Sequence, residues 1–210
     1  MASDLYITQF VRVVHHQAQN NDRIIFEKKS DSLDTFLAEW YNHLGSNYPK
    51  FFKMDRQSKL GFLATEVLLA QRLLAEEYSS ESVGIILSNA QASLDTDQRY
   101  FESTKTFASP GLFVYTLPNI VAGEISIRHH VKGETAFFVS PSFDAEWMAN
   151  YVSLVMTNPN TKACVAGWVD IKDQQADVLL YLTEKKKENG SIVHNTTTLD
   201  QLYKKGLWRS

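Results

Sequence analysis

The alternation of helical and strand patterns along the 210 residues predicts a protein of the α/β class. The strongest helical pattern begins at Asp55, in DRQSKLGFLATEVLLAQRLLAEEY, where apolar residues recur at helical spacing and predict a continuously buried face. The run SVGIILSNA follows it. A short stretch rich in valine and isoleucine and bounded by polar residues is typical of a central parallel strand covered on both faces. The order of strand, helix and strand favours a right-handed crossover within one sheet.

The remaining elements fit the same class. LYITQFVRVV has the composition of a strand, and RIIFEKK predicts another short strand after the polar turn QNND. SDSLDTFLAEWYNHLG predicts an amphipathic helix that is capped by Ser32 or Asp34 and ended by Gly45. Residues 91 to 108 are expected to form a loop or a short helix over the sheet edge. Later strands are predicted at TAFFV, KACVAGWVD and QADVLLYLTEKK, before a short helical end.

Composition limits the class of protein. The formal net charge of −3 gives no reason to expect nucleic acid or an anionic membrane as a partner. The N-terminus lacks the pattern of a signal peptide, and no apolar run approaches the ~20 residues that span a bilayer. We therefore expect a cytoplasmic protein in which residues 1 to 210 form a single domain.

One serine stands where α/β enzymes place a nucleophile. Ser142 follows a short apolar strand and precedes a helical pattern, at a strand-to-helix corner. Its surroundings, SPSFD, lack both glycines of the G-x-S-x-G elbow, and no pattern of histidine and acid that would activate the hydroxyl is evident. The competing interpretation is structural: Ser142 caps or nearly caps the helix DAEWMANYVSLVM, and Asp144 complements the positive end of that helix.

Other reactive side chains are expected to be structural. Cys164, the single cysteine, lies in the apolar run ACVAGWV and predicts core packing. His129, His130 and Glu124 suggest a metal site, but adjacent histidines on a helix point in different directions, so we expect no metal and no cofactor. The lysines at 185 to 187 fit a solvated strand end or a contact for an acidic carrier protein.

A family resemblance adds to this interpretation. PNIVAGEISIRHHVKG resembles the β-ketoacyl synthases of the thiolase-like superfamily, the condensing enzymes of fatty acid and polyketide synthesis. KFFKMDRQSKLGFLATEVLLA resembles the family's helix after a Met-Asp pair, and SVGIILSNAQASL its strand before a small-residue loop. ACVAGWVD, with Ala166 and Gly167, resembles the strand after the nucleophile helix. The resemblance covers most of residues 50 to 170 in the family's order.

The resemblance implies half of a thiolase-like fold, a three-layer α/β/α unit with a mixed five-stranded sheet that corresponds to the N-terminal half of a ketosynthase. An ungapped count from Gly133 to Ala166 and Gly167 places the family's active-site cysteine at Ser142. A serine hydroxyl needs a neighbouring base to approach the nucleophilicity of a thiolate. The family's two catalytic histidines lie in the C-terminal half, which 210 residues are not expected to hold. None of the six histidines matches a catalytic position: His15, His16, His43, His129, His130 and His194.

These implications favour a ketosynthase-like protein without condensation chemistry, acting as an accessory or chain-length-factor-like subunit in fatty-acid, polyketide or aryl-polyene-type synthesis. Its expected partners are an acyl carrier protein, a full-length ketosynthase or a second copy of the chain, and the resemblance implies subunit contact from Ala136 to Val139. The alternative is an acyltransferase or hydrolase that uses Ser142 on acyl-carrier or acyl-CoA thioesters. A small module that binds acyl chains without turnover is a third possibility.

Overall fold

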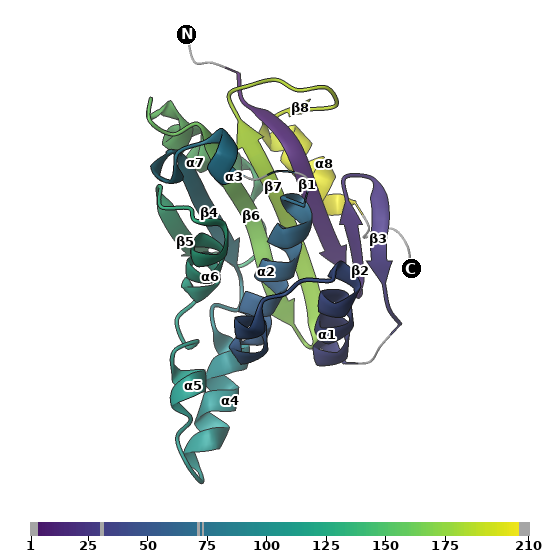
Figure 1. Ribbon diagram of the computed structural model, residues 1–210, viewed down its shortest axis with the longest axis vertical. Coiled ribbons are helices and arrows are strands. Elements are labelled where there is room, and N and C mark those ends of the chain that lie inside the picture. Colours follow the sequence, from purple (N-terminus) through teal and green to yellow (C-terminus); the bar gives the residue numbers. More distant parts are fainter. Residues whose placement is uncertain (1–3, 30–31, 71, 73, 206–210) are drawn as a thin grey trace.

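The computed structural model describes residues 4–29, 32–70, 72 and 74–205, and within them a mixed sheet of eight strands forms the centre of the molecule (Figure 1). The strands are β1 (Tyr6–Val14), β2 (Gln17–Asn20), β3 (Arg23–Glu27), β4 (Val83–Asn89), β5 (Thr135–Val139), β6 (Ala163–Lys172), β7 (Gln175–Glu184) and β8 (Ile192–Val193). Their spatial order is β3-β2-β1-β7-β6-β4-β5, and β8 pairs with β1. Strand β4 runs parallel to β5 and β6, whereas β7 is antiparallel to β6 and β1.

Helices cover both faces of this sheet. The α-helices are α1 (Leu33–Leu44), α2 (Arg56–Leu68), α3 (Leu74–Glu77), α4 (Leu94–Thr104), α5 (Pro110–Phe113), α6 (Ile120–His129), α7 (Ala145–Thr157) and α8 (Thr196–Lys204), with 3-10 turns η1 (Pro49–Lys53) and η2 (Ser80–Ser82). Helices α1, α2 and α6 pack on one face, and α7 and α8 on the other, which gives three layers (Figure 1). Across the described ranges, each helix is too short or too polar to cross a bilayer.

The alternation of side chains along β4 explains why two helical layers form. Ile85 and Leu87 belong to the core beneath α1, α2 and α6, whereas Ile86 points into the core beneath α7 and α8. Each of these three side chains is fully buried. An apolar run in a strand with paired neighbours on both sides therefore contributes to both cores, as the sequence predicts.

The sheet differs from the expected five strands. The chain after β1 folds back as the hairpin β2–β3, which extends the sheet beyond β1, and the short strand β8 pairs with Tyr6 and Ile7. Strands added at the edge of a sheet depend on local turns, here with His15, His16 and Asn21 at positive φ. The pattern of core residues does not specify them. The prediction of a three-layer α/β architecture with a mixed sheet is confirmed, and the prediction of five strands is wrong.

The first helix is capped by two of the residues that the sequence predicts. Ser32 is the N-cap of α1 and accepts a hydrogen bond from the backbone N–H of Thr35, and Gly45 ends the helix at a φ of 62°. Asp55 caps α2 by accepting from the N–H of Ser58 at 2.9 Å. Residues 91 to 108 contain the regular helix α4, which extends away from the sheet in place of lying over its edge (Figure 1).

Candidate functional site

Ser142 lies in the connection between β5 and α7, at the corner that the sequence predicts. Its side chain is exposed, and its backbone carbonyl accepts a hydrogen bond from the Oγ of Ser140 at 3.0 Å. Among the described residues, none forms a hydrogen bond with the Ser142 hydroxyl. The position can therefore be reached by a substrate, but no base among the described residues is hydrogen-bonded to it.

The helix cap belongs to a different residue. Asp144 is the N-cap of α7 and accepts a hydrogen bond from the N–H of Trp147 at 2.9 Å. Ser142 lies two residues before this cap, so of the two structural alternatives the near-cap position holds and the N-cap itself is wrong. A carboxylate at the N-cap both fills an unpaired amide and interacts favourably with the positive end of the helix.

This assignment predicts different costs for two neighbouring substitutions. We expect Asp144→Ala to lower the free energy of unfolding by about 1 kcal/mol, because an N-cap acceptor is lost. We expect Ser142→Ala to change it by less than about 0.5 kcal/mol, because the hydroxyl removed is exposed and bonds none of the described residues. Urea denaturation of both variants is the measurement. A loss in Ser142→Ala as large as that in Asp144→Ala would contradict Asp144 as the N-cap.

A polar cluster lies beside the corner and is joined to it by Phe143. The ring of Phe143 packs against the ring of Tyr203 at a centroid distance of 4.6 Å. The carboxylate of Asp177 accepts hydrogen bonds from the Tyr203 hydroxyl, from Arg12 at 2.6 Å and from the indole N–H of Trp168 at 3.2 Å. Three donors thus satisfy Asp177, which leaves this carboxylate poorly suited to act as a base for Ser142.

Arg12, on β1, connects the residues of this cluster through hydrogen bonds from its buried guanidinium. The guanidinium is fully buried, donates to the backbone carbonyls of Val178 and Tyr203, and lies 4.7 Å from the centroid of the Tyr203 ring. The sequence interpretation missed this group. Its signal was an arginine inside the otherwise apolar FVRVV, since a charge is buried in a strand only when it is paired.

The single cysteine does not replace the missing nucleophile. Cys164 lies on β6 with no exposed surface, which confirms the prediction of core packing. Burial raises the pKa of its thiol to about 12. A thiol of this kind stays protonated near neutral pH and is inert as a nucleophile.

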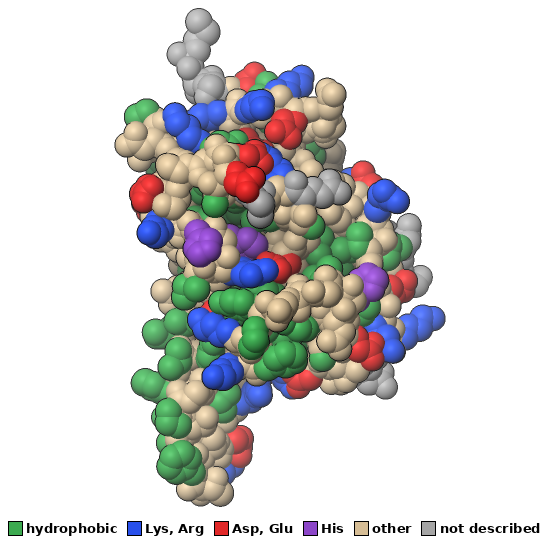
Figure 2. Space-filling model, in the orientation of Figure 1, with side chains coloured by type: hydrophobic (Ala, Val, Ile, Leu, Met, Phe, Trp, Pro, Cys, Tyr) green, Lys and Arg blue, Asp and Glu red, His purple; other side chains and the backbone are tan. Residues whose placement is uncertain are grey.

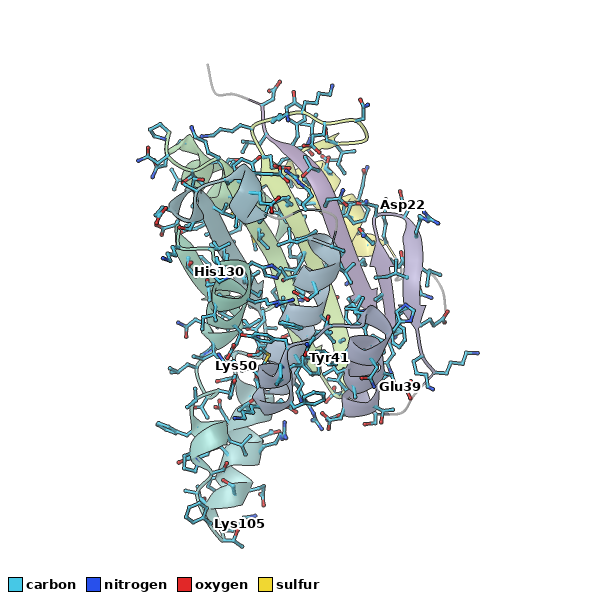
Figure 3. All side chains as sticks on the ribbon, in the orientation of Figure 1. Asp22, Glu39, Tyr41, Lys50, Lys105 and His130 are labelled. Carbon is cyan, nitrogen blue, oxygen red and sulfur yellow. The ribbon has the colours of Figure 1, made fainter. Side chains whose placement is uncertain are left out.

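His129 and His194 contact residues other than Ser142. His129 and His130 end α6, where the Nε2 of His129 lies 3.5 Å from a carboxylate oxygen of Glu66 (His130 is labelled in Figure 3). His194 lies 3.3 Å from the hydroxyl of Tyr181. Glu124 instead binds Lys50 and Tyr115, so the structure does not bring it together with the two adjacent histidines.

Burial of two histidines makes stability depend on pH. Burial lowers the pKa of His129 and of His194 to about 4 in each case. Because the unfolded chain then binds protons that the folded chain does not, we expect stability to fall as the pH drops from about 6.5 towards 4. Urea denaturation at a series of pH values measures this slope. The double variant His129→Gln/His194→Gln is expected to have a smaller slope, and an unchanged slope would contradict the assignment.

The basic run at the end of β7 is partly structural. Lys185 donates to the backbone carbonyls of Asn158 and Thr161, at 3.1 and 2.7 Å, and so holds the loop after α7. Lys187 lies 5.7 Å from the centroid of the Tyr6 ring. Lys186 and Lys187 are exposed and remain accessible to an acidic partner.

Two of the hollows among the described residues are a groove and a smaller hollow, both away from Ser142. A groove of about 600 Å³ runs beside α7 and β8 and has Leu154, Val193 and His194 in its walls. A hollow of about 350 Å³ lies over α2, α3 and α6, where Arg72, Arg128 and His129 line it. Ser142 lines neither of them, and its side chain is exposed.

No protein-family model matches the sequence, and no curated protein does either. Solved structures do match. "The ishigamide ketosynthase/chain length factor" has a TM-score of 0.60 at 17% identity, over 89% of this chain and 63% of that one. A ketosynthase in complex with its chain length factor from Xenorhabdus doucetiae gives 0.56 at 10% identity, over 87% of this chain and 79% of that one. A type II polyketide synthase acyl-carrier protein in complex with its ketosynthase gives 0.60 at 14% identity, over 92% and 67%.

At these identities the matches show the fold, which is the thiolase-like fold of ketosynthases. The chain spans 63% of the length of the first of these structures.

Proposed function

From a ketosynthase-like fold with serine at the corner after β5, we propose that this protein is an accessory or chain-length-factor-like subunit of fatty-acid, polyketide or aryl-polyene-type synthesis, and that it does not catalyse condensation. The observation that carries the proposal is Ser142. It stands where the resemblance places the family's cysteine, and its hydroxyl has no hydrogen-bond partner among the described residues.

The chemistry of the side chain supports inactivity. Thioester transfer needs a nucleophile that is ionised or that passes its proton to a base as it attacks. In the adjacent cluster, Asp177 already accepts from three donors, and its cross-strand neighbour Asp170 accepts from the backbone N–H groups of Ala90 and Gln91. The single cysteine is buried, with a thiol pKa of about 12. An exposed serine in these surroundings lacks both conditions.

The descriptions of the matching structures support the choice of partner. The matching structures are described as ketosynthases with a chain length factor or with an acyl-carrier protein. We propose that this chain likewise associates with a ketosynthase-fold chain through the segment from Ala136 to Val139 of β5, which among the described strands pairs on one side alone, with β4. Lys186 and Lys187 provide a small basic surface for an acyl carrier protein.

Acyl loading tests the proposal. The full chain is incubated with acetyl-CoA and with octanoyl-CoA, and its intact mass is then measured by mass spectrometry. We expect no mass increase corresponding to an acyl group, in the native chain or in the Ser140→Ala and Ser142→Ala variants.

The same experiment distinguishes the alternative enzyme. An acyltransferase or hydrolase that uses Ser142 would give an acyl adduct that persists in Ser140→Ala and is lost in Ser142→Ala. Ser140 is a matched control, because it lies on the same loop and carries the same side chain. That pattern would overturn the proposal of an inactive subunit.

A further inference from the structure

The groove beside α7 and β8 lies on the face of the sheet opposite to α1 and α2 and has a volume of about 600 Å³. Volumes of roughly 300–1,000 Å³ are typical of sites that hold small molecules. Four apolar side chains lie in its walls: Leu5, Leu154, Met156 and Val193. Leu154 and Val193 are 64% and 51% exposed, so the folded chain leaves apolar surface uncovered along the groove.

One polar side chain in the wall of the groove is buried and lacks a partner. His194 directly follows β8 and is 8% exposed. Its Nε2 lies 3.3 Å from the hydroxyl of Tyr181, whereas its Nδ1 is buried and bonds none of the described residues. A buried polar atom without a hydrogen bond is unfavourable, so the ring of His194 indicates a place for a partner from outside the described chain.

The contact with Tyr181 determines which kind of partner His194 requires. Burial lowers the pKa of His194 to about 4, so near pH 7 the ring is neutral and one nitrogen carries a hydrogen. The Tyr181 hydroxyl bonds no other described residue, and burial raises its pKa well above the usual value, so it keeps its hydrogen. If Tyr181 donates to Nε2, the Nδ1–H group alone remains unpaired; the opposite arrangement leaves two groups unpaired. Nδ1 is therefore a donor that requires an acceptor.

A positive charge in the same wall specifies this acceptor further. Lys185 donates to the backbone carbonyls of Asn158 and Thr161, and the third N–H of its ammonium group bonds none of the described residues. Burial and the nearby charge of Lys162 lower the pKa of Lys185. Asp4 also lies in the wall but is exposed to solvent. Figure 2 shows lysine and arginine side chains gathered at the upper end of the molecule, where β7 ends. A cation beside a neutral donor suits a carboxylate.

We propose that this groove binds a small carboxylate with an apolar body: the carboxylate accepts from His194 and Lys185, and the body lies against Leu154 and Val193. A flat protein surface cannot reach a donor that is 8% exposed, whereas a small molecule can enter the groove. Ser142 does not line the groove, so the inference goes beyond the proposed function and does not depend on it.

Calorimetric titration of the full chain with 3-phenylpropionate tests the proposal. We expect a dissociation constant below about 1 mM, which is ordinary for a ligand of this size in a partly apolar site. The uncharged amide 3-phenylpropionamide has the same apolar body and is expected to bind at least about tenfold more weakly, because it lacks the charge that pairs with Lys185.

Two substitutions locate the binding in the groove. Leu154→Asp places a negative charge in the apolar wall and is expected to raise the dissociation constant by at least about tenfold. Because Leu154 is 64% exposed, the fold is expected to tolerate this change. Leu117→Asp is the matched control, since Leu117 is 58% exposed in the connection between α5 and α6 and lies outside the groove. His194→Phe keeps a ring but removes the donor, and is expected to weaken binding to a similar extent.

Circular dichroism of each variant verifies that the fold is retained. Three results would overturn the proposal: no heat of binding with 3-phenylpropionate up to about 10 mM, which would leave water as the partner of His194; an amide that binds as tightly as the carboxylate; or a Leu154→Asp protein that binds as tightly as Leu117→Asp. Acyl loading at Ser142 is measured separately, so either proposal can fail alone.

Discussion

Replacing Gly167 by alanine is expected to prevent stable folding, with a loss of at least about 4 kcal/mol in the free energy of unfolding. Gly167 lies on β6 at a φ of 142°, a conformation that residues with a Cβ rarely adopt. A Cβ at this position would lie 1.9 Å from the backbone carbonyl oxygen of Leu179 on β7. Because the obstacle is backbone in a fully paired strand, no side-chain movement relieves it, and the strands themselves would have to separate.

Gly123 provides the control for this prediction. It lies within α6 at an ordinary φ, and a Cβ there would meet nothing within 4 Å. Gly123→Ala is expected to stabilise the protein by about 0.5–1 kcal/mol, because alanine favours the helix. Yield of folded protein and urea denaturation compare the two variants. A folded Gly167→Ala protein of native stability would show that β6 and β7 do not approach as described.

The second large effect is expected at the buried ion pair of Glu184 and Arg72. The carboxylate of Glu184 is buried at the end of β7 and accepts from Arg72 at 2.6 and 2.9 Å, and from the hydroxyls of Thr8 and Tyr78. Burial alone would raise the pKa of Glu184, but the hydrogen bonds from these three residues outweigh it and hold the pKa below its usual value. This contribution to stability is complete above the unfolded carboxyl pKa and is lost as the pH falls through the lower, folded value.

Arg72→Met is therefore expected to cost about 3–5 kcal/mol at pH 7, because it leaves a buried carboxylate without its cation. The loss should be smaller near pH 4, where the carboxyl group takes up a proton instead. Urea denaturation at both pH values measures the difference.

Two controls separate this pair from the rest of the arginine's contacts. Glu77→Gln removes the exposed partner of Arg72 and is expected to cost less than about 1 kcal/mol. In a Glu184→Gln background, Arg72→Met is expected to cost much less than in the native chain, since no buried charge is left behind. Equal costs in the two backgrounds would contradict an ion pair as the source of the stability.

The sequence predicts the parts of the fold that depend on local pattern. The runs around β4 and α2 have the periodicity of a covered strand and a buried helix, and the structure forms both. The helical pattern that starts at Asp55 is nevertheless interrupted, because α2 ends at Leu68 and α3 (Leu74–Glu77) is a separate helix. The helix α1 begins and ends at Ser32 and Gly45, because caps are properties of neighbouring residues.

Features that depend on contacts between residues far apart in the sequence cannot be predicted from local pattern. The role of Arg12 requires Asp177, which reaches it only through the register of β1 against β7. The extra strands require a hairpin to pair with an edge that local pattern does not define. The cap of α7 falls on Asp144 and not on Ser142, since the length of the loop after β5 is not encoded in periodicity.

The projection of helices α4 and α5 beyond the end of the sheet belongs to this second group (Figure 1). Residues 91 to 108 are polar with interspersed aromatic side chains, a composition that fits a surface loop as well as an arm. Only the three-dimensional placement of Phe101, Phe107 and Phe113 away from the core reveals them as an uncovered surface.

We propose that this chain has a ketosynthase fold and does not catalyse condensation, and a condensation assay tests both statements together. The most direct measurement supplies the purified chain with an octanoyl-carrier thioester and a malonyl-carrier thioester, and follows carbon dioxide release and the β-ketoacyl product by mass spectrometry. If the chain does not catalyse condensation, carbon dioxide and the β-ketoacyl product form no faster than in the absence of protein. Formation of the β-ketoacyl product by the chain alone, abolished in Ser142→Ala and retained in Ser140→Ala, would contradict it.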